Sequence, residues 1–146
     1  MKVLSKYPSL STQSEELVSK LPLNAKGLHR INFADGRINL SLVYGDLKET
    51  LSELKNPFIK YDAWYLDGFS PGKNPEMWSK KIASCIAESS HSETTFATYS
   101  EAGVVKNNLE RANFKLSKIK GFGDKRRMLT GKYQGKYKKA TSTRKS

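Results

Sequence analysis

The stretch from Tyr61 to Trp78, YDAWYLDGFSPGKNPEMW, places an acid where an apolar run breaks into a loop. The run before Asp67 is apolar apart from Asp62, which is typical of a buried parallel strand. Two glycines and two prolines follow within a few residues, and they exclude both strand and helix there. Asp67 is therefore predicted at the last residue of a strand. In open α/β sheets ligands bind outside the carboxyl ends of the strands, so Asp67 is the first candidate for chemistry.

Residues on two loops could contact a nucleic acid. Phe69 could stack on a flipped-out base, or it could belong to the core. Lys125, Arg126 and Arg127 lie between glycines on a later loop, where they suit phosphate contacts or form a solvated charged loop. Lys73 would join the same face if the two loops converge.

The elements before this stretch are a short strand, a helix, a hairpin and a second helix. They are predicted at Lys2–Ser5, within Ser9–Leu21, at Leu28–Phe33 with Ile38–Tyr44, and at Leu47–Leu54. An Asp-Gly pair between two alternating runs is a strong hairpin signal. The second arm ends in Gly45-Asp46, so Asp46 is a second acid at the end of a strand.

The elements after the Asp67 loop alternate until a final pair of strands. A helix is predicted from Glu76 to about Glu88, a strand at Glu93–Tyr99, a helix at Glu101–Ala112, and strands at Phe114–Lys120 and Met128–Tyr133. Asn74 and Ser100 are the predicted N-caps of the two helices. This alternation predicts an α/β fold with a doubly wound, mostly parallel sheet. The last two strands have only the loop 121–127 between them, so they are predicted to pair antiparallel.

Composition limits the partners of the chain. With 146 residues and a formal net charge of +12, it is one domain of ordinary size that suits an anionic partner. RNA, DNA and an acidic membrane surface all qualify. From Gln134 onward the sequence has no acid and several Lys and Arg, which predicts a disordered basic tail that either contacts RNA or only solubilises the chain.

The single cysteine and the apolar runs indicate the compartment. Cys85 has no second cysteine to pair with, which fits a reducing compartment such as the cytoplasm, and it is expected in the core rather than as a nucleophile. The sequence has no Cys/His cluster, so a metal site is not predicted. No apolar run approaches the ~20 residues of a membrane helix.

Three segments in order carry a resemblance to a known family. They are LDGFSPGKNPEMW at 66–78, ATYSEAGVV at 97–105 and GFGDKRRMLTG at 121–131. Together they resemble the MnmC family of tRNA-modifying methyltransferases. The resemblance implies a class I, Rossmann-like methyltransferase sheet, which agrees with the fold predicted from the pattern.

The resemblance also implies a reaction. It would transfer a methyl group from S-adenosylmethionine to the aminomethyl group of a modified wobble uridine in tRNA, giving 5-methylaminomethyl-2-thiouridine. In that reaction Asp67 would hydrogen-bond the amine and aim its lone pair, although Asp67 could instead cap the following turn. Asp46 would accept from the adenine amino group of the cofactor, or it caps the helix at Leu47.

The sequence departs from the family in its cofactor residues. It lacks the glycine-rich turn that the family carries after its first strand, and Ser5 stands where the family has an acid for the cofactor ribose. We therefore expect an incomplete sheet in an N-terminally truncated domain at 1–133, followed by the tail at 134–146. The strand at Val3 is expected to be weakly attached or displaced. The alternative is a non-enzymatic basic RNA-binding module derived from the same fold. Nothing in the sequence resembles the family's flavin-dependent domain.

Overall fold

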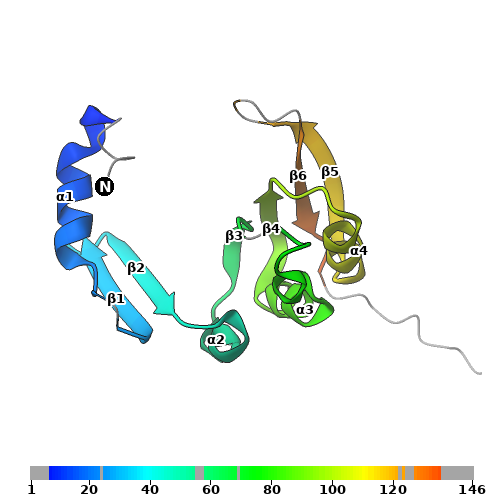
Figure 1. The fold of residues 1–146 in the computed structure, drawn as a ribbon, viewed down its shortest axis with the longest axis horizontal. Helices are drawn as coiled ribbons and strands as arrows, with labels where there is room; N and C mark the ends of the chain where they lie inside the picture. The colour runs from blue at the N-terminus through cyan, green and yellow to red at the C-terminus, as the bar shows by residue number, and fades with distance from the viewer. Residues whose placement is uncertain are drawn as a thin grey trace, which may run out of the picture. The chain divides into compact units, whose positions relative to one another are not determined.

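The computed structural model describes residues 7–23, 25–54, 58–68, 70–121, 123 and 127–135. The predicted strand at Val3, with Ser5, and the tail from residue 136 lie outside these ranges. The chain divides into two compact units, residues 1–53 and 54–146, which are described separately (Figure 1). No helix of the described residues has both the length and the apolar character needed to cross a membrane.

The first unit consists of two helices and a hairpin. Its elements are η2 (Pro8–Leu10), α1 (Ser11–Lys20), β1 (Gly27–Phe33), β2 (Ile38–Tyr44) and α2 (Leu47–Leu54). The predicted hairpin is confirmed, with Gly27 opposite Tyr44 and Phe33 opposite Ile38. The described residues 7–23 hold only η2 and α1, so this segment supplies no strand.

The hairpin is stabilised by the residues of its turn and by contacts with α1. Ala34, Asp35 and Gly36 all have positive φ, at 50°, 56° and 85°, and Asp and Gly tolerate this conformation best. The end of α1 is held against the hairpin by Lys20, whose Nζ donates to the Asn32 carbonyl over 2.9 Å. The same ammonium lies 4.9 Å from the centre of the Phe33 ring, which adds a cation–π contact.

The second unit is a four-stranded sheet with two helices. Its elements are β3 (Tyr61–Tyr65), η3 (Pro75–Trp78), α3 (Lys80–Glu88), β4 (Ser90–Thr98), α4 (Gly103–Arg111), β5 (Phe114–Lys120) and β6 (Arg127–Tyr133). The strand order is β3-β4-β6-β5. β3 and β4 are parallel, and β6 is antiparallel to both β4 and β5. Three of the strands therefore run in one direction, and the predicted C-terminal antiparallel pair is confirmed.

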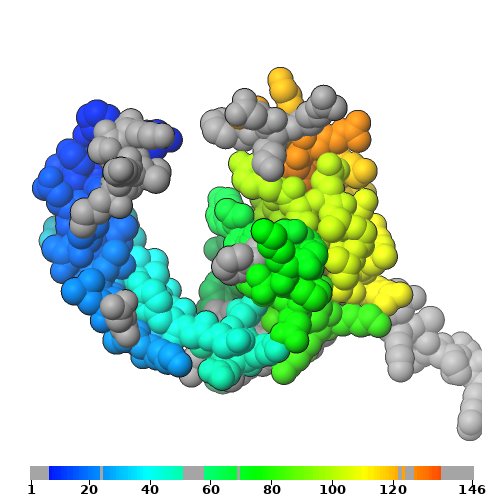
Figure 2. Space-filling model, in the orientation of Figure 1, coloured from blue at the N-terminus to red at the C-terminus, as the bar shows by residue number. Residues whose placement is uncertain are grey.

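Helices α3 and α4 cover one face of this sheet, as the ribbon and the space-filling views show (Figures 1 and 2). The core between these helices and the sheet is apolar and aromatic. Its buried members include Cys85, Phe96, Val105, Leu109, Phe114, Leu129 and Tyr133. Cys85 is therefore a core residue, as predicted. Burial raises the pKa of the Tyr133 phenol above its usual value, and the Glu88 carboxylate raises it further.

Two predicted helix starts are wrong. The helix predicted from Glu76 is interrupted, because η3 ends at Trp78 and α3 begins after Ser79. The Ser79 hydroxyl accepts from the Ile82 N–H over 3.5 Å and caps α3, whereas the Asn74 side chain makes no capping bond. Ser100 does not cap α4 either, because the helix begins at Gly103 and its N-cap residue is Ala102. The Ser100 N–H donates to the Thr98 hydroxyl over 3.1 Å.

Candidate functional site

Asp67 lies just beyond the carboxyl end of β3. The strand ends at Tyr65, and the Leu66 N–H extends the ladder by donating to the Ala97 carbonyl over 2.9 Å. Asp67 follows directly and is exposed. It lies two residues past the strand rather than on its last residue, at the predicted edge of the sheet. Among the described residues, no donor is hydrogen-bonded to its carboxylate.

Backbone bonds and packing hold the loop that follows Asp67. The Ser70 carbonyl accepts from the N–H groups of Lys73 and Asn74, over 2.9 and 3.0 Å, and these bonds close the turn. A Cβ at Gly68 would lie 3.4 Å from the Met77 side chain, so the backbone passes directly over η3. The end of η3 is fixed to α4, because Asn108 Nδ2 donates to the Trp78 carbonyl over 2.7 Å. Asp67 is therefore attached to a supported loop.

Asp46 caps a helix in the first unit. Its Oδ1 accepts from the Lys48 N–H over 2.8 Å, and its carbonyl accepts from the N–H groups of Glu49 and Thr50, over 3.0 and 2.9 Å. The capping alternative for Asp46 is thus present in the structure. An open hollow of about 420 Å³ reaches the residue before it, Gly45, and is also lined by Leu21, Pro22, Leu23, Ala25, Lys26 and Tyr44. The hollow is mainly apolar and has one aromatic ring at its wall.

Only part of the predicted RNA surface lies within the described residues. Phe69, Lys125 and Arg126 lie outside them. Lys73 is exposed on the turn of the Asp67 loop. Arg127 is exposed at the start of β6, at the same edge of the sheet as the carboxyl ends of β3, β4 and β5.

Lys120 also belongs to this edge, although it was not among the residues predicted from the sequence. It pairs with Arg127 across the β5–β6 hairpin, and both side chains are exposed. Its position as the last residue of a predicted strand, across from the basic loop, is the signal that could have identified it. The sheet order leaves β4 between this basic pair and β3, the strand that Asp67 follows.

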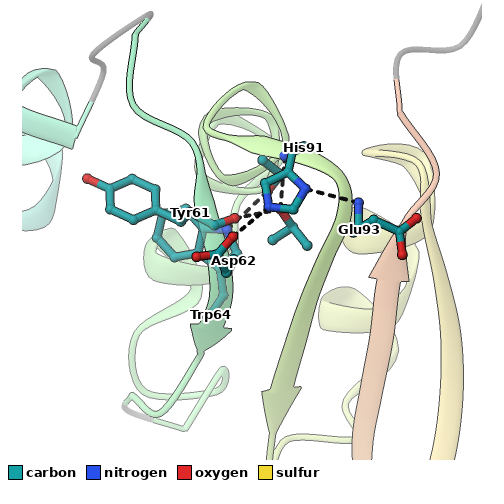
Figure 3. Close-up of polar contacts among 7 residues, drawn as sticks. Tyr61, Asp62, Trp64, His91 and Glu93 are labelled. Atoms are coloured by element: carbon teal, nitrogen blue, oxygen red, sulfur yellow. Dashed lines mark hydrogen bonds and ion pairs between the residues drawn. The ribbon is translucent and has the colours of Figure 1, made fainter.

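A polar cluster lies at the opposite end of β3 (Figure 3). Asp62 Oδ1 lies 2.8 Å from His91 Nε2, and the Glu93 N–H donates to His91 Nδ1 over 3.1 Å. Because Nδ1 accepts a hydrogen bond, Nε2 carries the proton and donates to Asp62. The Thr94 hydroxyl donates to the Tyr61 carbonyl over 2.5 Å.

These bonds stabilise an irregular segment of β4. Tyr61 pairs with Ser90 and Ala63 pairs with Thr95, so Asp62 alone faces the four residues 91–94. The cluster therefore has a structural role. Among the described residues, no group of three or more His, Cys, Asp or Glu is placed to hold a metal ion.

The comparison with known families agrees with this geometry. Residues 8–134 match the sequence model of a family described as S-adenosyl-L-methionine-dependent methyltransferase. The chain belongs to this family. Its fold class, an incomplete Rossmann-like α/β sheet, is the one that the sequence predicted.

Curated relatives of the family identify the branch that the chain resembles. It is 46% identical over 131 residues to the tRNA 5-methylaminomethyl-2-thiouridine biosynthesis bifunctional protein MnmC of Aeromonas hydrophila. It is 41% identical over 131 residues to the protein of the same name from Pseudoalteromonas translucida. Each alignment covers 89% of this chain and 20% of the relative. The resemblance to MnmC is confirmed, and the chain spans about a fifth of the length of these relatives.

A solved structure of the family supports the fold. The crystal structure of MnmC2 from Aquifex aeolicus aligns with a TM-score of 0.66 and 27% sequence identity. The alignment covers 84% of this chain and 36% of that one. The likeness therefore extends over most of the described elements.

Proposed function

We propose that residues 1–133 act as the methyltransferase segment of a cytoplasmic tRNA-modifying enzyme, with residues 134–146 as a basic tail. The substrate would be the aminomethyl group of a modified wobble uridine, converted from 5-aminomethyl-2-thiouridine to 5-methylaminomethyl-2-thiouridine. The observation that carries the proposal is the exposed Asp67 carboxylate, which has no hydrogen-bond partner among the described residues and follows a parallel strand directly. Membership of the family and the names of its relatives support the choice of reaction.

Asp67 would act on the substrate amine. A primary alkylamine resembles a lysine side chain, whose usual pKa is about 10.4, and is mostly protonated at neutral pH. It must lose a proton before its nitrogen lone pair can attack a methyl group. A carboxylate within hydrogen-bonding distance accepts that proton and fixes the direction of the lone pair. S-adenosylmethionine, when bound, supplies the electrophilic methyl group.

In this proposal the adenine end of the cofactor would lie in the hollow next to Asp46. The hollow beside Asp46 has the apolar wall and the Tyr44 ring that an adenine base needs, and the second Asp46 oxygen can accept from an exocyclic amino group. Asp46 can make this contact while its Oδ1 remains bonded to the Lys48 N–H. Capping and cofactor contact are therefore compatible at this residue.

We expect little or no binding of S-adenosylmethionine by this chain alone. The sequence has no glycine-rich turn for the methionine half, and Ser5 cannot hold both ribose hydroxyls as a carboxylate does. Isothermal calorimetry should detect no saturable heat at micromolar cofactor. Micromolar one-to-one binding would show that other residues replace the glycine-rich turn and the ribose-binding acid.

The excess positive charge favours RNA binding with or without catalysis. The net charge is +12, and Lys125, Arg126 and Arg127 stand together in the sequence. Phosphate contacts release counterions, so tRNA affinity is expected to fall steeply with salt. Replacing the three residues by Ala should weaken binding and reduce the slope of log affinity against log salt by about 2–3, if each contacts one phosphate.

A matched control uses three cations from the helices. Lys80, Lys81 and Arg111 are exposed on α3 and α4, and their replacement by Ala removes the same charge. Filter binding over a range of salt concentrations distinguishes the two triple variants. Equal slopes for both variants would mean that the loop makes no specific phosphate contact.

The experiment that tests the proposed function measures binding and methyl transfer in one mixture. The chain is incubated with hypomodified tRNA and a high concentration of methyl-labelled S-adenosylmethionine, so that weak cofactor affinity does not prevent turnover. Label in the tRNA supports the methyltransferase. Salt-dependent tRNA binding without any label overturns it and supports the alternative, a non-enzymatic RNA-binding module.

A further inference from the structure

The second unit has one sheet face that its own helices do not cover. Trp64, Phe96 and Leu129 point to the side of α3 and α4. Successive side chains of a strand alternate between the two faces, so the neighbours of these residues on each strand point to the other side. We call this other side the open face, and it includes Tyr65, Thr95, Lys115, Ser117, Thr130 and Lys132. An open hollow of about 610 Å³ lies along it, bounded by residues of all four strands.

The side chains of the open face differ from those of a core. Tyr65 is 84% exposed on β3, the first strand of the sheet order. Thr95, Ser117 and Lys115 are also exposed, on β4 and β5. The hydroxyl and ammonium groups can donate hydrogen bonds, whereas the covered face presents Phe96, Phe114 and Leu129. The open face therefore suits a polar partner with flat apolar rings better than it suits an apolar helix.

The lysine ammonium groups on the open face favour binding of an anion. Lys115 and Lys132 are direct partners across the antiparallel β5–β6 pair, where Cβ atoms are about 5 Å apart and like charges repel. Glu93 forms an ion pair with Lys132 over 2.5 Å, but Lys115 has no ion-pair partner among the described residues. None of the described residues lining the hollow is acidic. A phosphate beside Lys115 would relieve the repulsion.

We propose that the open face binds single-stranded RNA. One base would stack on the Tyr65 ring, and the sugar-phosphate backbone would cross β4 and β6 towards Lys115. The three strand spacings between β3 and β5 amount to about 14 Å, enough for more than one nucleotide. The choice of RNA over other polyanions rests on the proposed function. Tyr65 is the last residue of β3 and Asp67 comes two residues later, so the proposed site lies on the sheet face next to the loop that carries Asp67.

Fluorescence anisotropy with a labelled oligouridine of about eight nucleotides tests this site. Tyr65→Ala should weaken binding about tenfold, because base–aromatic stacking is lost, and Tyr65→Phe should bind as the wild type does. Lys115→Gln should lower affinity and reduce the salt slope by about 0.7, the value for one phosphate of a single strand. The high exposure of Tyr65 means that its removal should leave the thermal melting curve unchanged.

The control for Lys115 is Lys118→Gln. Lys118 lies on the same strand but on the other face, where its Nζ is 3.7 Å from Glu101 Oε1. Its replacement should leave oligouridine affinity within about twofold of the wild type, because an exposed pair contributes little. Equal effects of Lys115→Gln and Lys118→Gln would overturn the proposed site.

Two further measurements distinguish RNA on the open face from catalysis at Asp67 and from a second protein copy. Asp67→Asn should bind oligouridine normally, so a loss of methyl transfer with retained binding concerns the proposed function alone. If sedimentation shows a dimer that Tyr65→Ala dissociates while oligouridine binding is unchanged, a second protein copy covers the open face and RNA does not. Wild-type affinity in both Tyr65→Ala and Lys115→Gln would also overturn the proposal.

Discussion

Replacing Asp67 by Asn is expected to slow methyl transfer to tRNA by about 100-fold or more. Asn has nearly the same shape as Asp, so the loop over η3 should keep its conformation. An amide cannot accept the proton of an alkylammonium group, and it would leave the substrate nitrogen protonated at neutral pH. The effect should fall on the rate of transfer, while tRNA affinity stays near that of the wild type.

The matched control is Asp62→Asn, on the strand that precedes Asp67. Asp62 is also exposed, but it lies at the opposite end of β3 and hydrogen-bonds His91. Its replacement should change the transfer rate by no more than a few fold. Single-turnover transfer of labelled methyl at a high cofactor concentration gives both rates. If the two variants are equally active, Asp67 has no role in proton transfer.

Replacing Gly131 by Ala is expected to destabilise the second unit by about 3 kcal/mol. A Cβ at this position would overlap Phe96 Cε1 and would lie 2.6 Å from the Lys115 carbonyl oxygen. A rotation of the Phe96 side chain could relieve the first overlap, but the second is with backbone. Relief would therefore require β5 and β6 to separate, and both strands belong to the core sheet.

Gly103→Ala provides the comparison for this variant. Gly103 is the first residue of α4, and a Cβ there would meet no atom within 4 Å. Ala should stabilise the chain by about 0.5 kcal/mol, because glycine loses more backbone entropy in a helix. Urea denaturation followed by circular dichroism measures both changes. A Gly131→Ala midpoint equal to that of the wild type would mean that the β5–β6 pair can adjust without cost.

Local signals were sufficient for much of the fold. The Asp35-Gly36 turn predicted the hairpin because few residue types adopt positive φ at low cost. The strand at Phe114–Lys120 has its predicted bounds. The break of the helix before Ser79 was missed, because η3 and an α-helix give similar apolar spacing over one turn.

Contacts between distant residues account for what the sequence could not show. The segment 90–92 belongs to β4 although it is polar, because His91 bonds Asp62 and Thr94 bonds Tyr61. Asp67 could be placed at a strand end from the apolar run and the glycine and proline residues after it. The open face could not be predicted, since Ala63 and Tyr65 give no sign of which side the helices cover.

The wobble nucleoside itself provides the most direct measurement of the central claim. Hypomodified tRNA is incubated with the chain and a high concentration of methyl-labelled S-adenosylmethionine, which offsets the weak cofactor affinity. The tRNA is then digested to nucleosides, which are separated with mass detection. We expect the label in the methylamino group of 5-methylaminomethyl-2-thiouridine, and its amount should fall by about 100-fold in Asp67→Asn. Label on another nucleoside, or label in the expected nucleoside that does not depend on Asp67, would contradict the assignment of Asp67 to this reaction.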